Sequence, residues 1–132
     1  MMATAPARME LRIPRRPEFV RMARRTTCAL AAQLDFTYDM VKDIELAVGE
    51  ACTNAVRHVE KARSDDILVR FTVESQRLVI EIIDYGQGFQ PEEEGGEGLG
   101  LVVMRSVMDE VDIHCQAETG TCVRMVKYRG GA

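Results

Sequence analysis

The order in which strand-like and helix-like segments follow one another constrains the fold of this chain most. Runs with strand character cover residues 9–13, 67–73, 78–83, 111–116 and 122–128. Apolar residues at helical spacing predict helices from Pro17 to about Leu34, from Thr37 to about Val59, and from Leu99 to Met108. The chain therefore reads as strand, two helices, two strands, helix, two strands.

This order predicts an α+β fold. Consecutive strands occur in groups that are separated first by two helices and then by one. This pattern favours a two-layer α/β sandwich, with a mixed or antiparallel sheet covered on one face by helices. A doubly wound parallel fold would alternate strands and helices singly, and it is the second alternative. The 132 residues suffice for one hydrophobic core but not for two. We therefore expect a single domain over residues 1–132, with residues 1–7 as a disordered tail.

Composition excludes several functions. The net charge of −4 and the pI near 5.2 argue against direct binding to nucleic acid, which needs clustered cations. No apolar run approaches the roughly 20 residues of a membrane span, and the N-terminus lacks the apolar stretch of a signal peptide. The cysteines form no C-x-x-C pair and no metal-ligand spacing with histidine. These features predict a cytoplasmic protein whose cysteines are small core residues in a reducing compartment.

Two polar residues of the predicted second helix have the chemistry of a nucleotide site. Glu50 and Asn54 are four residues apart, so they project from one helix face. The Asn54 carbonyl is a hard oxygen donor suited to Mg²⁺ on a triphosphate. Glu50 can polarise an attacking hydroxyl or water, or hold a metal-bound water. The alternative is a pair that is merely exposed to solvent, and His58 one turn later is more often a surface histidine.

A carboxylate that could recognise a nucleobase follows an apolar strand. Asp84 is followed by Gly86 and Gly88, which let the backbone turn sharply. A carboxylate accepts a hydrogen bond from the exocyclic amine of adenine, whereas guanine presents an acceptor, O6, at that position. An ordinary Asp/Gly loop fits the pattern equally well. Thr121 follows Gly120 at the start of the last strand. A threonine in such a position is common, so it supports a nucleotide site only in combination with Asp84.

A glycine-rich run precedes the predicted third helix. Unpaired N–H groups at a helix N-terminus, with the helix dipole behind them, form an anion site, and glycines let phosphates approach. The run contains no G-K-[ST] and opens no βαβ unit, so it is neither a Walker A loop nor a Rossmann fingerprint. We expect backbone amides, magnesium and, as a further candidate, Arg105 to hold the phosphates. The residues that this run contributes are Gly96, Gly98, Leu99, Gly100 and Leu101.

With these motifs in this order, the chain resembles the GHKL (Bergerat-fold) ATPases and, within them, the small anti-sigma factor/serine-protein kinases of the RsbW and SpoIIAB type. The resemblance runs from about residue 9 to residue 128. It implies an ATP and Mg²⁺ site in which Glu50 is catalytic, Asn54 binds magnesium, and Asp84 and Thr121 lie near adenine. The stretches 50–55 and 108–111 favour this subgroup over other GHKL proteins.

The resemblance also implies partners. A protein of this group would sequester an alternative sigma factor of RNA polymerase and transfer the γ-phosphoryl of ATP to a serine or threonine of an anti-anti-sigma (STAS-type) protein. Relatives are homodimers, so a homodimer is expected. One alternative is an ATP-binding regulatory module with negligible phosphoryl transfer, favoured by the short acidic segment 89–95 where the family often has a longer lid. Another is a switch kinase that acts on a stressosome scaffold.

Arginines crowd the start of the chain, where half of them lie in the first 25 residues. They form either a solvated helix face or a docking surface for an acidic protein partner. Because partners in the family contact the matching helix, the resemblance implies that Arg21 and Arg24 bind the partner.

Overall fold

The computed structural model describes residues 6–57, 66–84, 98–116 and 120–129. Every predicted strand and helix is present. The strand at the N-terminus begins at Ala7, inside the segment expected to be a tail, because its pairing with the next strand extends to Val73. The elements are β1 (Ala7–Pro14), α1 (Pro17–Gln33), α2 (Tyr38–Arg57), β2 (Asp66–Val73), β3 (Arg77–Asp84), α3 (Gly98–Val107), β4 (Glu110–Gln116) and β5 (Gly120–Tyr128).

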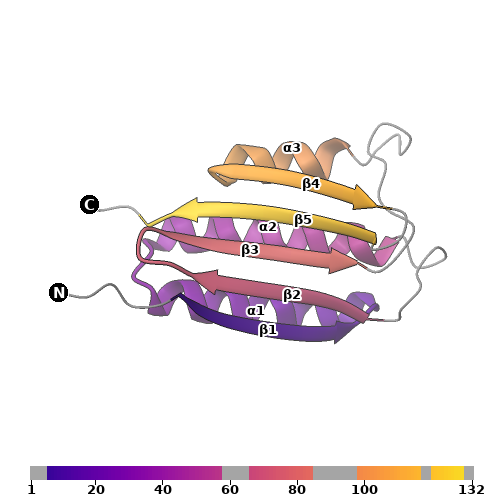
Figure 1. Ribbon diagram of the computed structural model, residues 1–132, viewed down its shortest axis with the longest axis horizontal. Helices are drawn as coiled ribbons and strands as arrows, with labels where there is room; N and C mark the ends of the chain where they lie inside the picture. The colour runs from indigo at the N-terminus through magenta and orange to yellow at the C-terminus, as the bar shows by residue number, and fades with distance from the viewer. Residues whose placement is uncertain (1–5, 58–65, 85–97, 117–119, 130–132) are drawn as a thin grey trace.

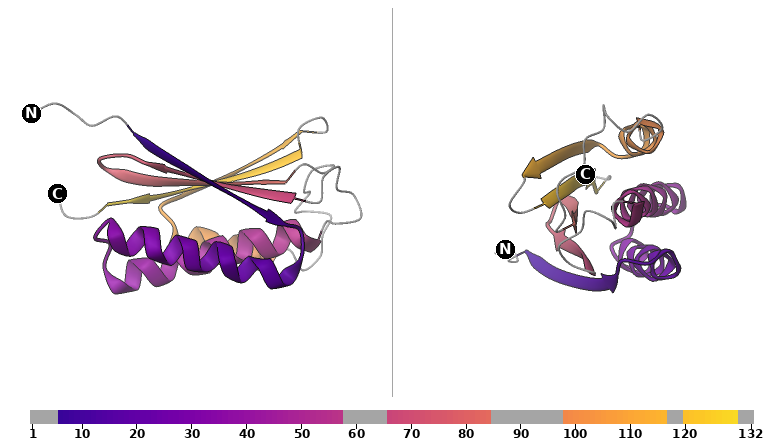
Figure 2. Two further views of the ribbon diagram at one scale, coloured as in Figure 1. Left: turned by 90° about the horizontal axis from the view of Figure 1, so that it is seen from below. Right: turned by 90° about the vertical axis from the view of Figure 1, so that its right-hand side faces the viewer.

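The strands form one sheet in the order β1-β2-β3-β5-β4, and each neighbouring pair is antiparallel. All three helices lie on the same face of this sheet (Figures 1 and 2). The predicted α+β two-layer sandwich is therefore confirmed. The doubly wound parallel alternative is wrong, because the described strands contain no parallel pair.

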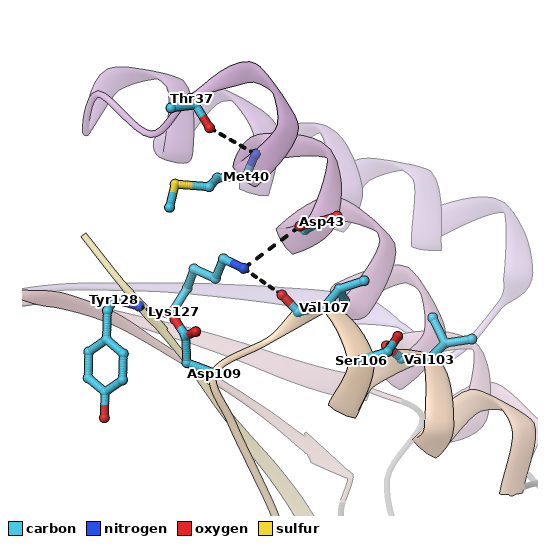
Figure 3. Close-up of polar contacts among 9 residues, drawn as sticks. All are labelled: Thr37, Met40, Asp43, Val103, Ser106, Val107, Asp109, Lys127 and Tyr128. Atoms are coloured by element: carbon cyan, nitrogen blue, oxygen red, sulfur yellow. Dashed lines mark hydrogen bonds and ion pairs between the residues drawn. The ribbon is translucent and has the colours of Figure 1, made fainter. Parts of the chain in front are cut away.

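Local sequence sets where the first two helices begin. Pro17 is the first residue of α1, where its missing N–H costs no hydrogen bond, and the preceding Arg16 is extended. Thr37 caps α2, because its Oγ1 accepts a hydrogen bond from the Met40 amide at 3.2 Å (Figure 3). None of the helices that the structure describes is long and apolar enough to cross a membrane.

The core lies between the sheet and the helix layer. The sheet contributes large side chains, and the facing stripes of α1 and α2 contribute many alanines, which let the helices pack close to the strands. The fully buried sheet residues include Ile67, Val69, Phe71, Leu78, Ile80 and Met125. The alanines are Ala23, Ala31, Ala47, Ala51 and Ala55. A layer this thin brings α2 close enough for its polar face to meet the ends of β3 and β5.

A row of alternating charges crosses the face of the sheet opposite the helices. Its members are register partners, one per strand in sheet order: Glu10, Arg70, Glu81, Arg124 and Asp112. The Arg70 Nε donates to Glu10 at 2.9 Å, and an Arg70 Nη lies 3.5 Å from a Glu81 carboxylate oxygen. Opposite charges directly across strands stabilise a sheet. This row lets the sheet face that no helix covers stay in water.

Strand β5 connects the C-terminal end of α3 to α2 (Figure 3). The Lys127 ammonium donates to the carbonyl of Val107 at 2.5 Å and lies 3.8 Å from the Asp43 carboxylate. The Tyr128 amide donates to the Asp109 carboxylate at 2.7 Å. This bond ties the turn between α3 and β4 to the end of β5. The Lys127 side chain is only 10% exposed. A buried cation at a helix C-terminus both satisfies a carbonyl and complements the helix dipole.

We expect Lys127→Met to lower the free energy of unfolding by about 1 to 3 kcal/mol, because the Val107 carbonyl loses its donor in a buried place. Lys42→Met is the matched control, since Lys42 is exposed, pairs with Glu45 at 3.5 Å and lies over the Tyr38 ring. That change should cost less than about 1 kcal/mol. Urea unfolding followed by circular dichroism measures both. Equal losses in the two variants would contradict a structural role for Lys127.

Candidate functional site

The site begins where α3 approaches α2. A Cβ added to Gly100 would lie 3.1 Å from the Glu50 Oε1 and 3.2 Å from the Asn54 Nδ2. The first turn of α3 therefore rests directly against these two side chains of α2. Asn54 is buried and Glu50 is half-buried. The fold thus brings together two motifs that are separated by more than forty residues of sequence.

The N-terminus of α3 has the features of an anion site. The helix begins at Gly98 and has no acidic residue in its first turn. The first amides of a helix have no partner within it, and the dipole favours negative charge there. Leu99 is 74% exposed, and Leu101 packs partly against the core. Arg105 is exposed in the last turn of α3, at the end opposite Gly98.

Several predicted site residues lie outside the described residues. They are Gly86, Gly88 and Gly96, together with the acidic segment 89–95. Their assignment to the site stays a prediction.

Beside this anion site is an apolar pocket between α2, the sheet and α3. It is a small hollow with about 20 Å³ open to the centres of water molecules. The lining residues are Ala51, Asn54, Ala55, Ile82, Asp84, Met104, Ile113, Thr121 and Val123. A flat apolar group with a polar edge, such as a nucleobase, suits such a lining.

Besides Asn54, the polar side chains of the pocket come from two paired residues. Asp84 at the end of β3 faces Thr121 at the start of β5, and each is 5% exposed. Gly120 has a φ of 88°, a conformation that glycine adopts readily, and leads the chain into Thr121. The Thr121 hydroxyl oxygen is buried and has no hydrogen-bond partner among the described residues. Because buried polar atoms are nearly always satisfied, this oxygen is available to a water molecule or to a ligand in the pocket.

Arg15 is the neighbour of Asp84 that the sequence did not reveal. It follows β1, and its side chain is 1% exposed. One guanidinium nitrogen donates to the Ala55 carbonyl at 2.6 Å, and another is in ion-pair contact with the Asp84 Oδ1. That oxygen lacks a hydrogen bond of good geometry in spite of the contact, so the pairing is chiefly electrostatic. Arg15 therefore belongs neither to a solvated helix face nor to an exposed docking surface.

Other N-terminal arginines line a groove between α1 and α2. The groove has room for about 350 Å³ of water centres and is lined by Pro17, Glu18, Val20, Arg21, Arg24, Thr53, Val56 and Arg57. Arg21 is exposed, and the Arg24 stem lies along Gly49, whose added Cβ would be 3.2 Å from the Arg24 Cδ. The Arg24 guanidinium is 3.8 Å from the Glu45 carboxylate. Thr53 lies three residues after Glu50 on α2, so the groove adjoins the side of α2 that carries Glu50.

The pKa of every cysteine whose side chain is described is raised, for Cys28 chiefly by burial. Burial raises the pKa of the Cys52 thiol to about 12. Burial, with the Glu81 carboxylate nearby, raises the pKa of Cys122 to about 11. Both thiols therefore stay protonated at neutral pH.

No group of three or more histidine, cysteine, aspartate or glutamate side chains that could hold a metal occurs in the part of the chain that the structure describes. The Asn54 carbonyl oxygen fits Mg²⁺, an ion that often takes only one or two protein ligands and completes its shell with phosphate oxygens and water. The donor set here therefore suits magnesium that arrives with a nucleotide, rather than a metal held by protein groups alone.

Comparison with known proteins identifies the family. The model of the histidine kinase-like ATPase domain matches residues 13–127. The chain belongs to the histidine kinase-like ATPase family. This assignment confirms the resemblance to GHKL ATPases, and the named relatives below confirm that it is of the RsbW and anti-sigma factor type.

Its relatives in this ATPase family are similar over nearly their full length. The serine-protein kinase RsbW of Bacillus velezensis is 35% identical over 98% of this chain and 91% of that protein. The anti-sigma F factor of Caldanaerobacter subterraneus subsp. tengcongensis is 34% identical over 92% of this chain and 94% of that protein. A crystal structure of the RsbU and RsbW domains of a Mycobacterium tuberculosis protein superposes with a TM-score of 0.74, covering 97% of this chain and 34% of that one. Its 22% identity supports the fold alone.

We expect Gly100→Ala to leave the fold intact while weakening nucleotide binding. Alanine favours a helix by about 0.5 to 1 kcal/mol over glycine, so stability should not fall. Its Cβ would displace the Glu50 and Asn54 head groups, and misplacement of this kind should reduce the affinity for Mg-ATP by roughly tenfold or more. Gly49→Ala is the control, because its Cβ would meet only the flexible Arg24 stem. Isothermal titration measures the affinity, and unchanged binding by the Gly100 variant would remove this contact from the site.

Proposed function

We propose that the protein is an anti-sigma factor and a serine-protein kinase. It sequesters an alternative sigma factor and uses Mg-ATP to phosphorylate a serine or threonine of an anti-anti-sigma (STAS-type) protein. The observation that carries the proposal is the contact of Glu50 and Asn54 with the first turn of α3. The names of the relatives, serine-protein kinase RsbW and anti-sigma F factor, support the same two activities.

In the proposed reaction the acceptor hydroxyl attacks the γ-phosphorus and the bond to the bridging oxygen breaks, releasing ADP. Glu50 takes the proton of the hydroxyl, since its carboxylate is only half-buried and faces the phosphate end of the site. Asn54 holds the magnesium ion, which when bound neutralises charge on the phosphates. The amides of Gly98, Leu99 and Gly100, with Leu101 and Gly96 beside them, hold phosphate oxygens.

The base would occupy the apolar pocket. Asp84 accepts the hydrogen bond of the adenine amine, and Thr121 supplies the polar atom beside it. Gly86 and Gly88, which lie outside the described residues, belong to the proposed nucleotide site because glycine permits a close approach of backbone to ligand. The buried, unpartnered Thr121 oxygen supports this placement.

The partner surface in this proposal is the groove between α1 and α2. Its walls hold three arginines against one glutamate, so they attract an acidic protein. Arg21 and Arg24 bind the partner, and the groove leads the acceptor residue toward Glu50. We further propose that the protein forms a homodimer and acts in the cytoplasm, where a sigma factor is found. The kinase names of the relatives favour phosphoryl transfer over a module that only sequesters its partner.

Glu50→Gln tests the reaction. Glutamine keeps the size and hydrogen bonding but cannot take the proton, so transfer to the anti-anti-sigma protein of the same organism should fall by roughly 10² to 10⁴. Binding of Mg-ATP should survive, as should capture of the sigma factor. Labelled ATP followed by electrophoresis measures transfer. Undiminished transfer by the variant would mean that another residue accepts the proton. If the unmutated protein shows no transfer, the alternative of a module that only sequesters its partner is favoured.

Arg21→Glu tests the docking surface. Reversing the charge of an exposed arginine in the groove should lower the association rate with an acidic partner, and more strongly at low salt. Affinity for Mg-ATP should stay unchanged, because Arg21 is not among the residues that line the base pocket. Surface plasmon resonance with the sigma factor and the anti-anti-sigma protein measures the rate. A parallel fall in ATP affinity would contradict a docking role.

A further inference from the structure

A buried guanidinium lies behind the carboxylate of the base pocket. Arg15 comes from the turn between β1 and α1, and its side chain contacts Asp84 on β3 and the Ala55 carbonyl on α2. The two side chains are 1% and 7% exposed, so the ion pair is shielded from water. Removing one partner of such a pair leaves an uncompensated buried charge. Each of the two side chains therefore serves as the buried counter-charge of the other.

The remaining walls of the pocket offer Asp84 no charge. They consist of alanine and asparagine from α2, isoleucine from β3 and β4, methionine from α3, and threonine and valine from β5. None of these groups titrates. A carboxylate in apolar surroundings without a counter-charge takes up a proton, because burial disfavours the ionised form. Among the residues that the structure describes, Arg15 is the cation in ion-pair contact with Asp84.

We propose that Arg15 is a positioning residue that sets the base specificity of the nucleotide site, because it keeps the Asp84 carboxylate ionised and therefore able only to accept hydrogen bonds. The inference rests on the proposed nucleotide-binding function. An ionised carboxylate accepts from the adenine amine and repels the O6 of guanine placed in the same way. A protonated carboxyl can donate to O6, and this discrimination is lost.

Three substitutions separate charge from hydrogen bonding. Arg15→Gln keeps a donor and removes the charge, while Arg15→Lys keeps the charge. Arg16→Gln is the matched control, because Arg16 is the exposed neighbour and pairs with Glu18. Isothermal titration of each variant with Mg-ATP and with Mg-GTP gives both affinities, and circular dichroism establishes that each variant is folded.

We expect the unmutated protein and the Arg16 variant to prefer ATP. In Arg15→Gln the ATP affinity should fall by about tenfold, and the preference for ATP over GTP should shrink by a similar factor. Arg15→Lys should retain the preference. If the role of Arg15 were purely structural, Arg15→Gln would weaken the binding of ATP and GTP equally and leave the ratio of the two affinities unchanged.

Several results would overturn the proposal. Among them are an unchanged ATP-to-GTP ratio in Arg15→Gln, and tighter ATP binding by that variant, which would mean that Arg15 competes with the base. If Arg15→Gln does not fold, Arg15→Lys decides, because loss of the ATP preference in the folded lysine variant contradicts the proposal and its retention supports it. An unmutated protein that binds neither nucleotide overturns the proposed function instead.

Discussion

The close approach of α3 to α2 at Gly100 is the constraint on which the candidate site depends. The Cβ of any other residue at this position would lie 3.1 Å from the Glu50 carboxylate and 3.2 Å from the Asn54 amide. The two helices can approach this closely because glycine has no side chain. At its other end α3 is held by Lys127, which reaches from β5 to the carbonyl of Val107, the last residue of the helix, and toward Asp43 of α2. One end of α3 thus meets the polar face of α2, and the other is fixed to the sheet.

The Arg15–Asp84 pair extends this arrangement to the base pocket. Its guanidinium joins the turn before α1 to the end of β3 and to the last turns of α2. The same turn leads at once into Pro17 and Glu18, which line the arginine groove. The segment that contacts Asp84 through Arg15 therefore also continues into a wall of the groove, although the groove and the base pocket lie on different sides of α2. A buried ion pair is costly to form, so its presence here points to a role beyond simple packing.

The sheet separates the structural and functional tasks of the fold. Its inner face supplies the large core side chains, and its outer face carries the alternating row from Glu10 to Asp112, which needs no covering layer. All three helices lie on the inner side (Figure 2), so the first turn of α3 meets the polar face of α2 at Gly100, and Asn54 of α2 lines a pocket with the ends of β3 and β5. The site is thereby built on helices and strand ends, which hold side chains more precisely than loops do.

The sequence by itself determined the elements, their order and the α+β class, because apolar periodicity and turn residues are local signals. Thr37 as a cap and Pro17 as a helix start were readable for the same reason. It also singled out Glu50, Asn54, Asp84 and Thr121 by residue type and position. Only the tertiary structure decided that Gly100 meets Glu50 and Asn54, and that Asp84 pairs with Arg15. Arg15 sits among exposed arginines between two prolines, and no local pattern distinguishes the one that is buried. Its burial depends on where β3 and α2 end in space, and contacts between distant segments are fixed by packing of the whole domain.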